Sequence, residues 1–531
     1  MFPAYGLEQY GLPTPRRNAE PWRQFDVAGL VATDYSDTPF DYGSILLLDH
    51  DKIKEIKAKL IHDSIWLEDE ACAGRLVYIN GRLTPSLSKL NDHTVNLAHS
   101  DFAKPSAHVT DHVVECLKRL TDGFTDQLAA DVPIRDSCLT SYKSLSGPNH
   151  NVGEPTKQFA MNSQQGSSCF VALNSIRSAA VALVNIPKDC NLTKPILIIN
   201  IEQEEEKVPY ADQSENVGFA FHPRTLIMAG ENSDVSIIQS YISLDTHSSK
   251  VCRPKFCNGY TQIFIESGAT VRHSYLEETG GIVTPGVEGG GDDYIDNGTV
   301  ARLTESQRKA LRDTHFEAID IHITGEKGRY EGTIMNFGGK GRSRIATSVS
   351  LLRPHAHANI NGFCLAGGAQ RNDFRTFIHH IAPDTSSSQL QKNMIGGRAS
   401  TTFRGRIRVE QSAQKTDSQQ LARSILLSDK ARVWAIPSLE IIADDVKCSH
   451  GATVSDLAEE ELFYLESRGV DKIKARNMLM YAFIDDVAAT VDPSIIGGKD
   501  DPSSLKSRIT KRLQALAPRG ARAIQGDFQS I

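Results

Sequence analysis

The sequence predicts a mainly β protein with a β-solenoid core between N-terminal and C-terminal helical regions. From about residue 155 to 450, short runs of Val, Ile, Leu and Phe recur between Gly, Asn, Asp or Pro, as in short strands joined by turns. Amphipathic helices are nearly missing between these runs, which argues against a sheet built from βαβ units. The region is longer than a typical single sandwich, which favours stacked coils. A sandwich and a barrel remain alternatives, because no strict repeat can be counted.

The N-terminal region, residues 1–154, is predicted to be helical with loops. The Pro-rich segment 11–23 has the composition of an extended arm lying on a domain. Segments 51–61 and 107–120 place apolar residues at helical spacing. Segment 91–102 has the composition of a loop.

The β core is predicted to span residues 155–453. Its apolar runs lie at 196–201, 224–228, 235–239, 261–265, 319–323, 348–352, 376–379, 406–409 and 439–443. A Gly-rich, acidic segment at about 279–312 interrupts them, and we interpret it as a surface insertion. A lid over a functional site is the alternative interpretation.

Residues 454–531 are predicted to form helices. Asp456 and Glu459 have the spacing of a helix cap, and Gly469 stands where a helix is expected to end. Apolar stripes follow at Met480, Ile484, Val487 and Val491, and at Leu505, Ile509, Leu513 and Leu516. The helices could cap the β core or dock a partner, and the stripes alone leave both alternatives open.

The composition is that of a soluble globular protein, with 40% hydrophobic and 23% charged residues among 531. The formal net charge of −7 argues against a nucleic-acid partner bound through a basic surface. No apolar run is long enough to cross a bilayer, so no membrane partner is expected. The first residues also lack the features of a secretory signal.

The nine cysteines are widely spaced and form no Cys-x-x-Cys pair. This pattern favours reduced thiols over a disulfide framework or a structural zinc site. Cys252 and Cys257 are poorly spaced for a ligand pair, and we assign them no role.

The clearest candidate site follows the last apolar run of the β core. Cys448 and His450 stand two positions apart, and Gly451 comes next. Side chains at this spacing on a strand point to the same side, so the thiol and the imidazole are expected to lie together. Both groups are good ligands for transition metals. The alternative interpretation is a buried thiol beside a structural histidine.

Several longer motifs resemble one known family. They are HPRTLI at 222–227, AQKTDSQQ at 413–420, LLSD at 426–429, PSLEIIADDVKCSHGAT at 437–453 and LFYLESRG at 462–469. In this order they resemble the SufD members of the SufB/SufD family, which are scaffold subunits of SUF iron–sulfur cluster assembly. The resemblance is dense from about 315 to 490, weaker from 195 to 275, and thin elsewhere.

The resemblance implies a right-handed parallel β-helix flanked by helical regions. It implies a non-catalytic scaffold that pairs with the paralogue SufB through the C-terminal end of the β-helix. The ATPase SufC would dock on the C-terminal helices, with Leu457, Phe463, Tyr464 and Met480 as anchors. A transient iron–sulfur cluster would form at the SufB–SufD interface, and a reduced flavin is a further cofactor suggested for the complex.

In this family pattern Cys448 and His450 are implied to be ligands of the nascent cluster, and His450 is the residue most closely tied to it. Clusters generally need about four ligands, so the remaining ligands would come from SufB. SufB-like chains carry Glu-His-Glu-Ala in place of Cys448–Ala452, and they have a cysteine in the segment that corresponds to 419–426. This chain has neither feature, which favours SufD.

Two other functions are weighed against this one. A β-helix enzyme acting on acidic polysaccharides would need charged groups clustered on one coil face. Asp320 with His322, or the arginines 404, 406 and 408, would have to form such a cluster. An interaction solenoid without an iron–sulfur role would not depend on iron or sulfide. No phosphate-binding glycine loop is found, so ATP binding is assigned to SufC. Chain length and the insertion favour the plastid stroma of a eukaryote over a cytoplasmic location.

Overall fold

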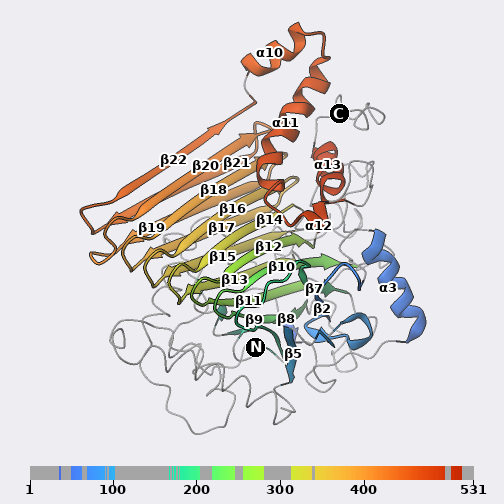
Figure 1. Cartoon of the computed structure of the whole chain (residues 1–531). Coiled ribbons are helices and arrows are strands. Elements are labelled where there is room, and N and C mark those ends of the chain that lie inside the picture. The colour runs from blue at the N-terminus through green and yellow to red at the C-terminus, as the bar shows by residue number, and fades with distance from the viewer. Residues whose placement is uncertain are drawn as a thin grey trace.

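The computed structural model shows a parallel β-helix with helices near both of its ends (Figure 1). The mainly β solenoid predicted from the sequence is therefore confirmed. The structure describes residues 35–37, 49–62, 69–89, 91–92, 95–101, 167, 170–171, 173–174, 178, 180–203, 218–244, 255–279, 313–337, 341–457, 459–496 and 504–516. The predicted arm at 11–23, the helix at 107–120 and almost all of the insertion lie outside these residues.

Two long sheets form the walls of the β-helix. The first contains, in spatial order, β21 (Arg432–Ile441), β19 (Ser400–Val409), β17 (Arg371–His380), β15 (Arg342–Leu351), β13 (Thr314–Ile323), β11 (Lys255–Ile265), β9 (Arg224–Ala229), β6 (Ala180–Ile186), β5 (Val95–Asp101) and β4 (Asn91–Asp92). Beside it, β1 (Tyr35–Asp37) pairs with β8 (Gly218–Phe221), which pairs with β11.

The second sheet contains β22 (Lys447–Ser455), β20 (Asp417–Leu426), β18 (Ser386–Ile395), β16 (His357–Ala366), β14 (Arg329–Asn336), β12 (Thr270–Glu278), β10 (Asp234–Ser243), β7 (Ile196–Glu202), β2 (Gly74–Ile79) and β3 (Arg82–Leu83). From β9 onward successive strands alternate between the two sheets, so each coil adds one strand to each wall. Inward apolar side chains from both walls, such as Ile263, Ile319, Ile360 and Ile407, form one continuous core.

The N-terminal region contributes strands as well as a helix. Helix α3 (His50–His62) confirms the helix expected at 51–61. The prediction of a loop at 91–102 is wrong, because β4 and β5 lie there and β5 pairs antiparallel with β6. The short helix η3 (Pro85–Leu87) follows β2 and β3. Pairing of β2 with β7 therefore extends the β core well before residue 155.

Four helices follow β22: α10 (Glu459–Ser467), α11 (Lys472–Ala488), α12 (Pro493–Ile496) and α13 (Leu505–Leu516). Gly469 has φ +84° just after α10, which confirms the predicted end of that helix. Asp471 caps the next helix by accepting hydrogen bonds from the amides of Ile473 and Lys474. No helix in the described part of the chain is both long and apolar enough to cross a membrane.

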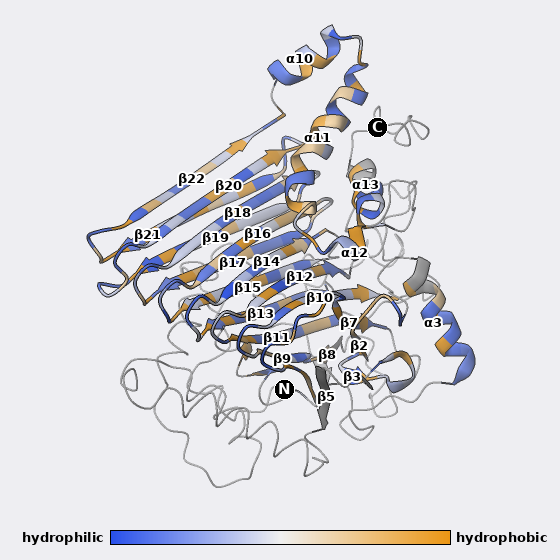
Figure 2. Cartoon of the chain, viewed as in Figure 1, coloured by the Kyte–Doolittle hydropathy of each residue, from blue (hydrophilic) through white to orange (hydrophobic). Residues whose placement is uncertain are grey.

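Helices α11 to α13 cover part of the outer face of the second sheet. Both predicted apolar stripes are buried there up to Leu513, among outward residues such as Met335, Phe363 and Met394. Figure 2 shows apolar residues along α11 and α12 where these helices lie beside the strands. Burying each large apolar side chain contributes about 1.5–3 kcal/mol, so these stripes hold the helices on the β-helix.

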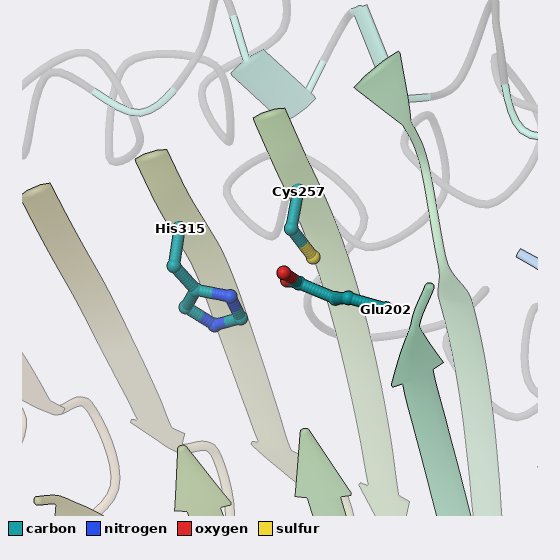
Figure 3. A group of neighbouring side chains, drawn as sticks. All are labelled: Glu202, Cys257 and His315. Atoms are coloured by element: carbon teal, nitrogen blue, oxygen red, sulfur yellow. The ribbon is translucent and has the colours of Figure 1, made fainter. Parts of the chain in front are cut away.

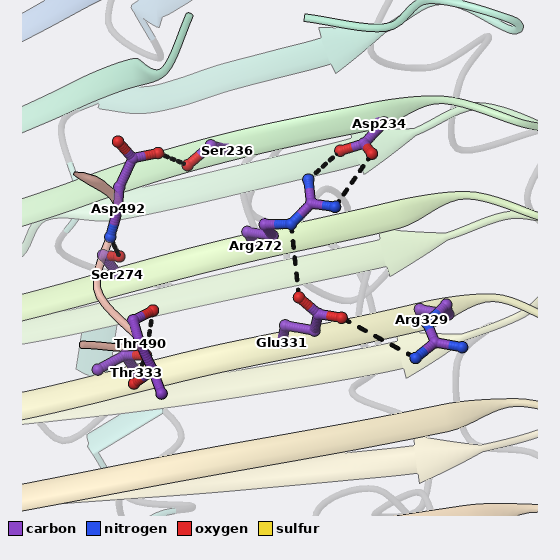
Figure 4. Close-up of polar contacts among 9 residues, drawn as sticks. All are labelled: Asp234, Ser236, Arg272, Ser274, Arg329, Glu331, Thr333, Thr490 and Asp492. Carbon is purple, nitrogen blue, oxygen red and sulfur yellow. Dashed lines mark hydrogen bonds and ion pairs between the residues drawn. The ribbon is translucent and has the colours of Figure 1, made fainter. Parts of the chain in front are cut away.

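A polar seam fastens the chain between α11 and α12 to the same face (Figure 4). The Thr333 hydroxyl donates to the Thr490 carbonyl at 3.1 Å, and the two threonine hydroxyls lie 2.8 Å apart. The Asp492 amide donates to the Ser274 hydroxyl at 3.2 Å, and its carboxylate accepts from the Ser236 hydroxyl. The seam therefore spans strands β10, β12 and β14 and fixes where the helices lie.

Candidate functional site

The last coil leaves one side of each sheet without a neighbouring strand. Within the described residues, β21 pairs only with β19, and β22 pairs only with β20. Figure 1 shows this coil at the end of the β-helix farthest from β2 and β5, with α10 lying beyond it. The unpaired backbone groups of such strands can pair with another chain.

Cys448 and His450 lie on β22 in the row of side chains that faces the interior of the β-helix. Their register partners on β20 are Ser418 and Gln420, which are both buried. Because no described coil follows, Cys448 is half-buried and His450 is exposed. The register thus places both side chains on one side of the strand, at the open end of the interior.

A polar row continues from His450 into the β-helix. Gln420 donates from Nε2 to Gln389 Oε1 at 2.6 Å, and Gln389 donates to the Thr376 hydroxyl at 2.7 Å. These side chains are buried, and stacked glutamines satisfy one another along the coil axis. His450 therefore stands at the exposed end of a hydrogen-bonded interior row.

The Cys448 thiol is not activated by its own chain. Burial raises the pKa of this thiol, and the nearby Asp417 carboxylate adds to the shift. A thiol becomes a good metal ligand when a cation displaces its proton. One thiol and one imidazole supply two of the about four ligands that an iron–sulfur cluster needs.

Large apolar side chains surround this end of the molecule. Leu421, Ile441, Ile442 and Val454 are all exposed on or beside the last coil. The other exposed large apolar residues of the described chain are Phe463 and Tyr464 on α10. Apolar exposure is therefore concentrated on the terminal coil and the helix that follows it, as at a contact surface.

The four expected docking residues divide into two pairs. Phe463 is 72% exposed and Tyr464 is 57% exposed, and the Arg468 guanidinium lies over the Tyr464 ring, 5.2 Å from its centroid. Leu457 is 7% exposed and Met480 is 2% exposed, and both pack in the cluster between the helices and the second sheet. Only Phe463 and Tyr464 are thus available to a partner.

A second group of potential metal ligands lies inside the β-helix, and no motif in the sequence indicates it. Figure 3 shows Glu202, Cys257 and His315 converging from separate strands. Their ligand atoms all lie within 4.8 Å of one another. Burial raises the pKa of the Cys257 thiol well above its usual range, and the Glu202 carboxylate adds to the shift. Burial lowers the pKa of His315 to about 3. No local motif links these residues, because only strand register brings them together.

The residues considered for a polysaccharide enzyme do not line an open site. Asp320 and His322 are buried, with Asp320 accepting a hydrogen bond from the Tyr260 hydroxyl at 2.9 Å. Arg406 is paired with Glu440, and Arg408 with Glu410. A large acidic sugar could not reach the first pair, and Arg406 and Arg408 already have acidic partners.

Comparison with known proteins agrees with the motifs. The family model described as the SufBD core domain of the SUF system for FeS cluster assembly matches residues 210–483. An iron–sulfur cluster assembly SufBD family protein of Synechocystis sp. is 25% identical over 490 residues, which cover 92% of this chain and 86% of the relative. The chloroplastic protein ABCI7 of Arabidopsis thaliana is 26% identical over 377 residues, covering 69% of this chain and 68% of that protein.

A third relative, the iron–sulfur cluster assembly protein SufD of Escherichia coli, is 35% identical over 179 residues, or 34% of this chain and 40% of SufD. The matched family model covers more than half of the chain and includes the terminal coil, α10 and most of α11. The chain therefore belongs to the SufBD core family of the SUF system for iron–sulfur cluster assembly.

Proposed function

We propose that this chain is a SufD-type scaffold subunit, which pairs with SufB and docks the ATPase SufC without being an enzyme itself. The observation that carries the proposal is the terminal coil. It combines unpaired strand edges, exposed apolar residues and the Cys448–His450 pair at one end of the β-helix. Pairing with a second β-helix would extend the sheets and cover the apolar residues.

In this proposal the nascent cluster is cargo that is held between two subunits. His450 supplies an imidazole nitrogen, and Cys448 supplies a thiolate once iron displaces its proton. SufB supplies the remaining ligands. Since neither subunit alone has a full set, cluster assembly would require the pair.

SufC docking is assigned to α10. This helix has no buried residue, and it presents Phe463 and Tyr464 beyond the last coil. Exposed aromatic side chains on a short helix suit a partner with an apolar pocket. Leu457 and Met480 support the contact indirectly, by fixing the helical region on the β-helix.

The test is co-expression of the chain with the SufB and SufC proteins of the same source, followed by purification without oxygen. The three proteins are expected to co-purify with bound iron and sulfide, and the flavin absorbance is measured on the same sample. Failure of SufB and SufC to co-purify would contradict the scaffold proposal.

If the source is a eukaryote, we propose the plastid stroma as the location, which microscopy of the tagged chain would check.

Replacing His450 by Ala tests the cluster site within that complex. The complex should remain intact while its iron and sulfide content falls, because loss of even an outer-shell partner costs about 10–100-fold in metal affinity. The matched control is Ser449→Ala, which changes the neighbouring exposed residue on the opposite side of β22. Equal cluster content in the two variants would show that His450 is misassigned.

Replacing Phe463 and Tyr464 together by Ala tests the docking helix. SufC is expected to be lost from the complex while SufB is retained, because α10 is separate from the strand edges. Glu466→Ala on the same helix is the control, since Glu466 is exposed but carries a charged carboxylate in place of an aromatic ring. Retention of SufC by the double variant would contradict docking through α10.

A further inference from the structure

We propose that Glu202, Cys257 and His315 form an internal site for a divalent transition metal, Zn²⁺ or Fe²⁺. This inference goes beyond the proposed function, because the site lies within this chain and does not depend on SufB or SufC. The three side chains come from β7, β11 and β13, and they are 4%, 0% and 3% exposed. A metal here would be enclosed by one chain, unlike the cargo at the terminal coil.

The backbone holds two of the three ligands side by side. Cys257 and His315 are register partners on neighbouring parallel strands, where strands lie about 4.8 Å apart. Both belong to the first sheet, whereas Glu202 ends β7 of the second sheet and approaches from the other wall. The ligands therefore come from both walls of the β-helix, as Figure 3 shows.

The histidine is oriented as a metal ligand would be. Its Nε2 lies 2.6 Å from the Tyr275 hydroxyl, and the Tyr241 ring packs edge-on against it at 4.8 Å between centroids. The buried Nδ1 has no hydrogen-bond partner, and Figure 3 shows a ring nitrogen facing the Glu202 carboxylate. With Nε2–H donating to Tyr275, the Nδ1 lone pair points into the group, as in outer-shell control of metal-bound histidine.

The donor set fits a metal of intermediate softness. Thiolate, imidazole and carboxylate together suit Zn²⁺ or Fe²⁺ rather than Mg²⁺ or Ca²⁺, which prefer oxygen ligands. A carboxylate and a thiolate carry two negative charges, which one divalent cation neutralises in a buried site. The metal displaces the thiol proton, which leaves to solvent. Three protein ligands leave one coordination position for water or another donor.

The spacing requires only a small closure. Around a tetrahedral metal with bonds of about 2.0–2.3 Å, ligand atoms lie about 3.3–3.8 Å apart, compared with the present limit of 4.8 Å. Side-chain rotations that move each ligand atom by less than about 1 Å would complete the geometry. The strands need not move.

The test measures metal bound by the full chain in a Cys448→Ser background, which removes the thiol of the terminal coil. Zn²⁺, or Fe²⁺ without oxygen, is added, unbound metal is removed by gel filtration, and bound metal is counted by elemental analysis. About one equivalent is expected, and Cys257→Ser or His315→Gln should weaken binding by roughly tenfold or more.

Cys364→Ser is the matched control, because Cys364 is equally buried but has Asn372 and Thr401 as its neighbours in place of a carboxylate and an imidazole. This variant should bind as the parent does. Equal binding by the Cys257 and Cys364 variants, or no binding by the parent, would overturn the site. If the Cys257 and His315 variants misfold, X-ray absorption of the zinc-loaded parent still shows whether the metal has a sulfur ligand. One sulfur at about 2.3 Å is expected, and a shell of only nitrogen and oxygen would refute the proposal.

Discussion

His273 shows how the interior of the β-helix fixes the charge of a single residue. Its Nε2 lies 3.2 Å from Gln239 Oε1, and its Nδ1 lies 3.1 Å from the Tyr330 hydroxyl. The amide oxygen can only accept and the phenol can donate, so the neutral ring satisfies both contacts. Burial lowers the pKa of His273 to about 4, because the charged ring would have no water.

This pKa predicts acid sensitivity. Between pH 6.5 and about 4 the unfolded chain binds a proton at His273 that the folded chain does not bind. The free energy of unfolding should therefore fall as the pH falls through this window, with this residue contributing up to about 1.4 kcal/mol per pH unit. Above pH 6.5 the contribution is constant. Urea unfolding across this range measures the slope.

His273→Gln should lower that slope by up to about 1.4 kcal/mol per pH unit, because the amide does not titrate. Burial also lowers the pKa values of His315, His322 and His380, so these residues should keep the rest of the slope. Tyr330→Phe is the control, since it removes one hydrogen bond but leaves the imidazole in place. The Phe variant should be less stable at every pH while keeping the slope of the parent. An unchanged slope in His273→Gln would show that another group controls the acid response.

At the scale of elements, α11 depends on packing against the second sheet for its stability. Ile484 is 2% exposed and lies in the cluster formed by the C-terminal helices and the outer face of that sheet. Ile484→Ala should lower the free energy of unfolding by about 2–5 kcal/mol, through lost apolar burial and the cavity left behind.

Guanidinium unfolding measures this loss as a shift in midpoint. Lys472→Ala at the exposed start of α11 is the control, and it should change the midpoint little. Equal effects of the two substitutions would mean that α11 is not held by this apolar face. Hydrogen exchange of the α11 amides locates the loss, because a detached helix exchanges faster.

The strands of the two sheets differ in how well the sequence predicts them. Seven of the nine apolar runs, from 224–228 to 439–443, fall on strands β9 to β21 of the first sheet. The later strands of the second sheet have a polar inward row, as with Gln389 on β18 and Gln420 on β20. These polar side chains can be buried because they form hydrogen bonds with side chains of neighbouring coils. The hydrophobic pattern of a single strand cannot indicate such bonds.

The turns conceal the repeat for a related reason. Corresponding turns between the two sheets use left-handed residues of different types, including Asn232, Gly268, Lys327, His355 and Asp384. Backbone conformation is conserved from coil to coil while residue identity is not, so no sequence period can be counted. The helices were predictable because apolar spacing within one segment determines their buried face.

At the scale of the whole molecule, the two candidate sites differ in what predicts them. Cys448 and His450 are close in sequence and lie within a motif, so both the pair and its strand could be predicted. Glu202, Cys257 and His315 meet only through the register of three strands. Contacts between distant coils are set by the complete fold, and a single sequence does not show them.

The open end of the β-helix makes a prediction about the whole chain. The edges of β21 and β22, with exposed Ile441 and Val454, form a surface suited to strand pairing. Without the proposed partner SufB, the chain should self-associate through this end as its concentration rises. Ile441→Lys with Val454→Lys should keep it monomeric, because buried ammonium groups would have to lose their hydration.

Sedimentation over a concentration series measures the effect, and Ala482→Lys on the exposed side of α11 is the control for added positive charge. The control should self-associate as the parent does, whereas the double variant should not.

The same double variant should also lose SufB on co-expression, because both contacts would use one surface. A parent chain that stays monomeric over the whole concentration series would contradict self-association through the terminal coil. A double variant that still binds SufB would separate the self-association surface from the SufB surface, and the proposed pairing would then have to lie elsewhere on the chain.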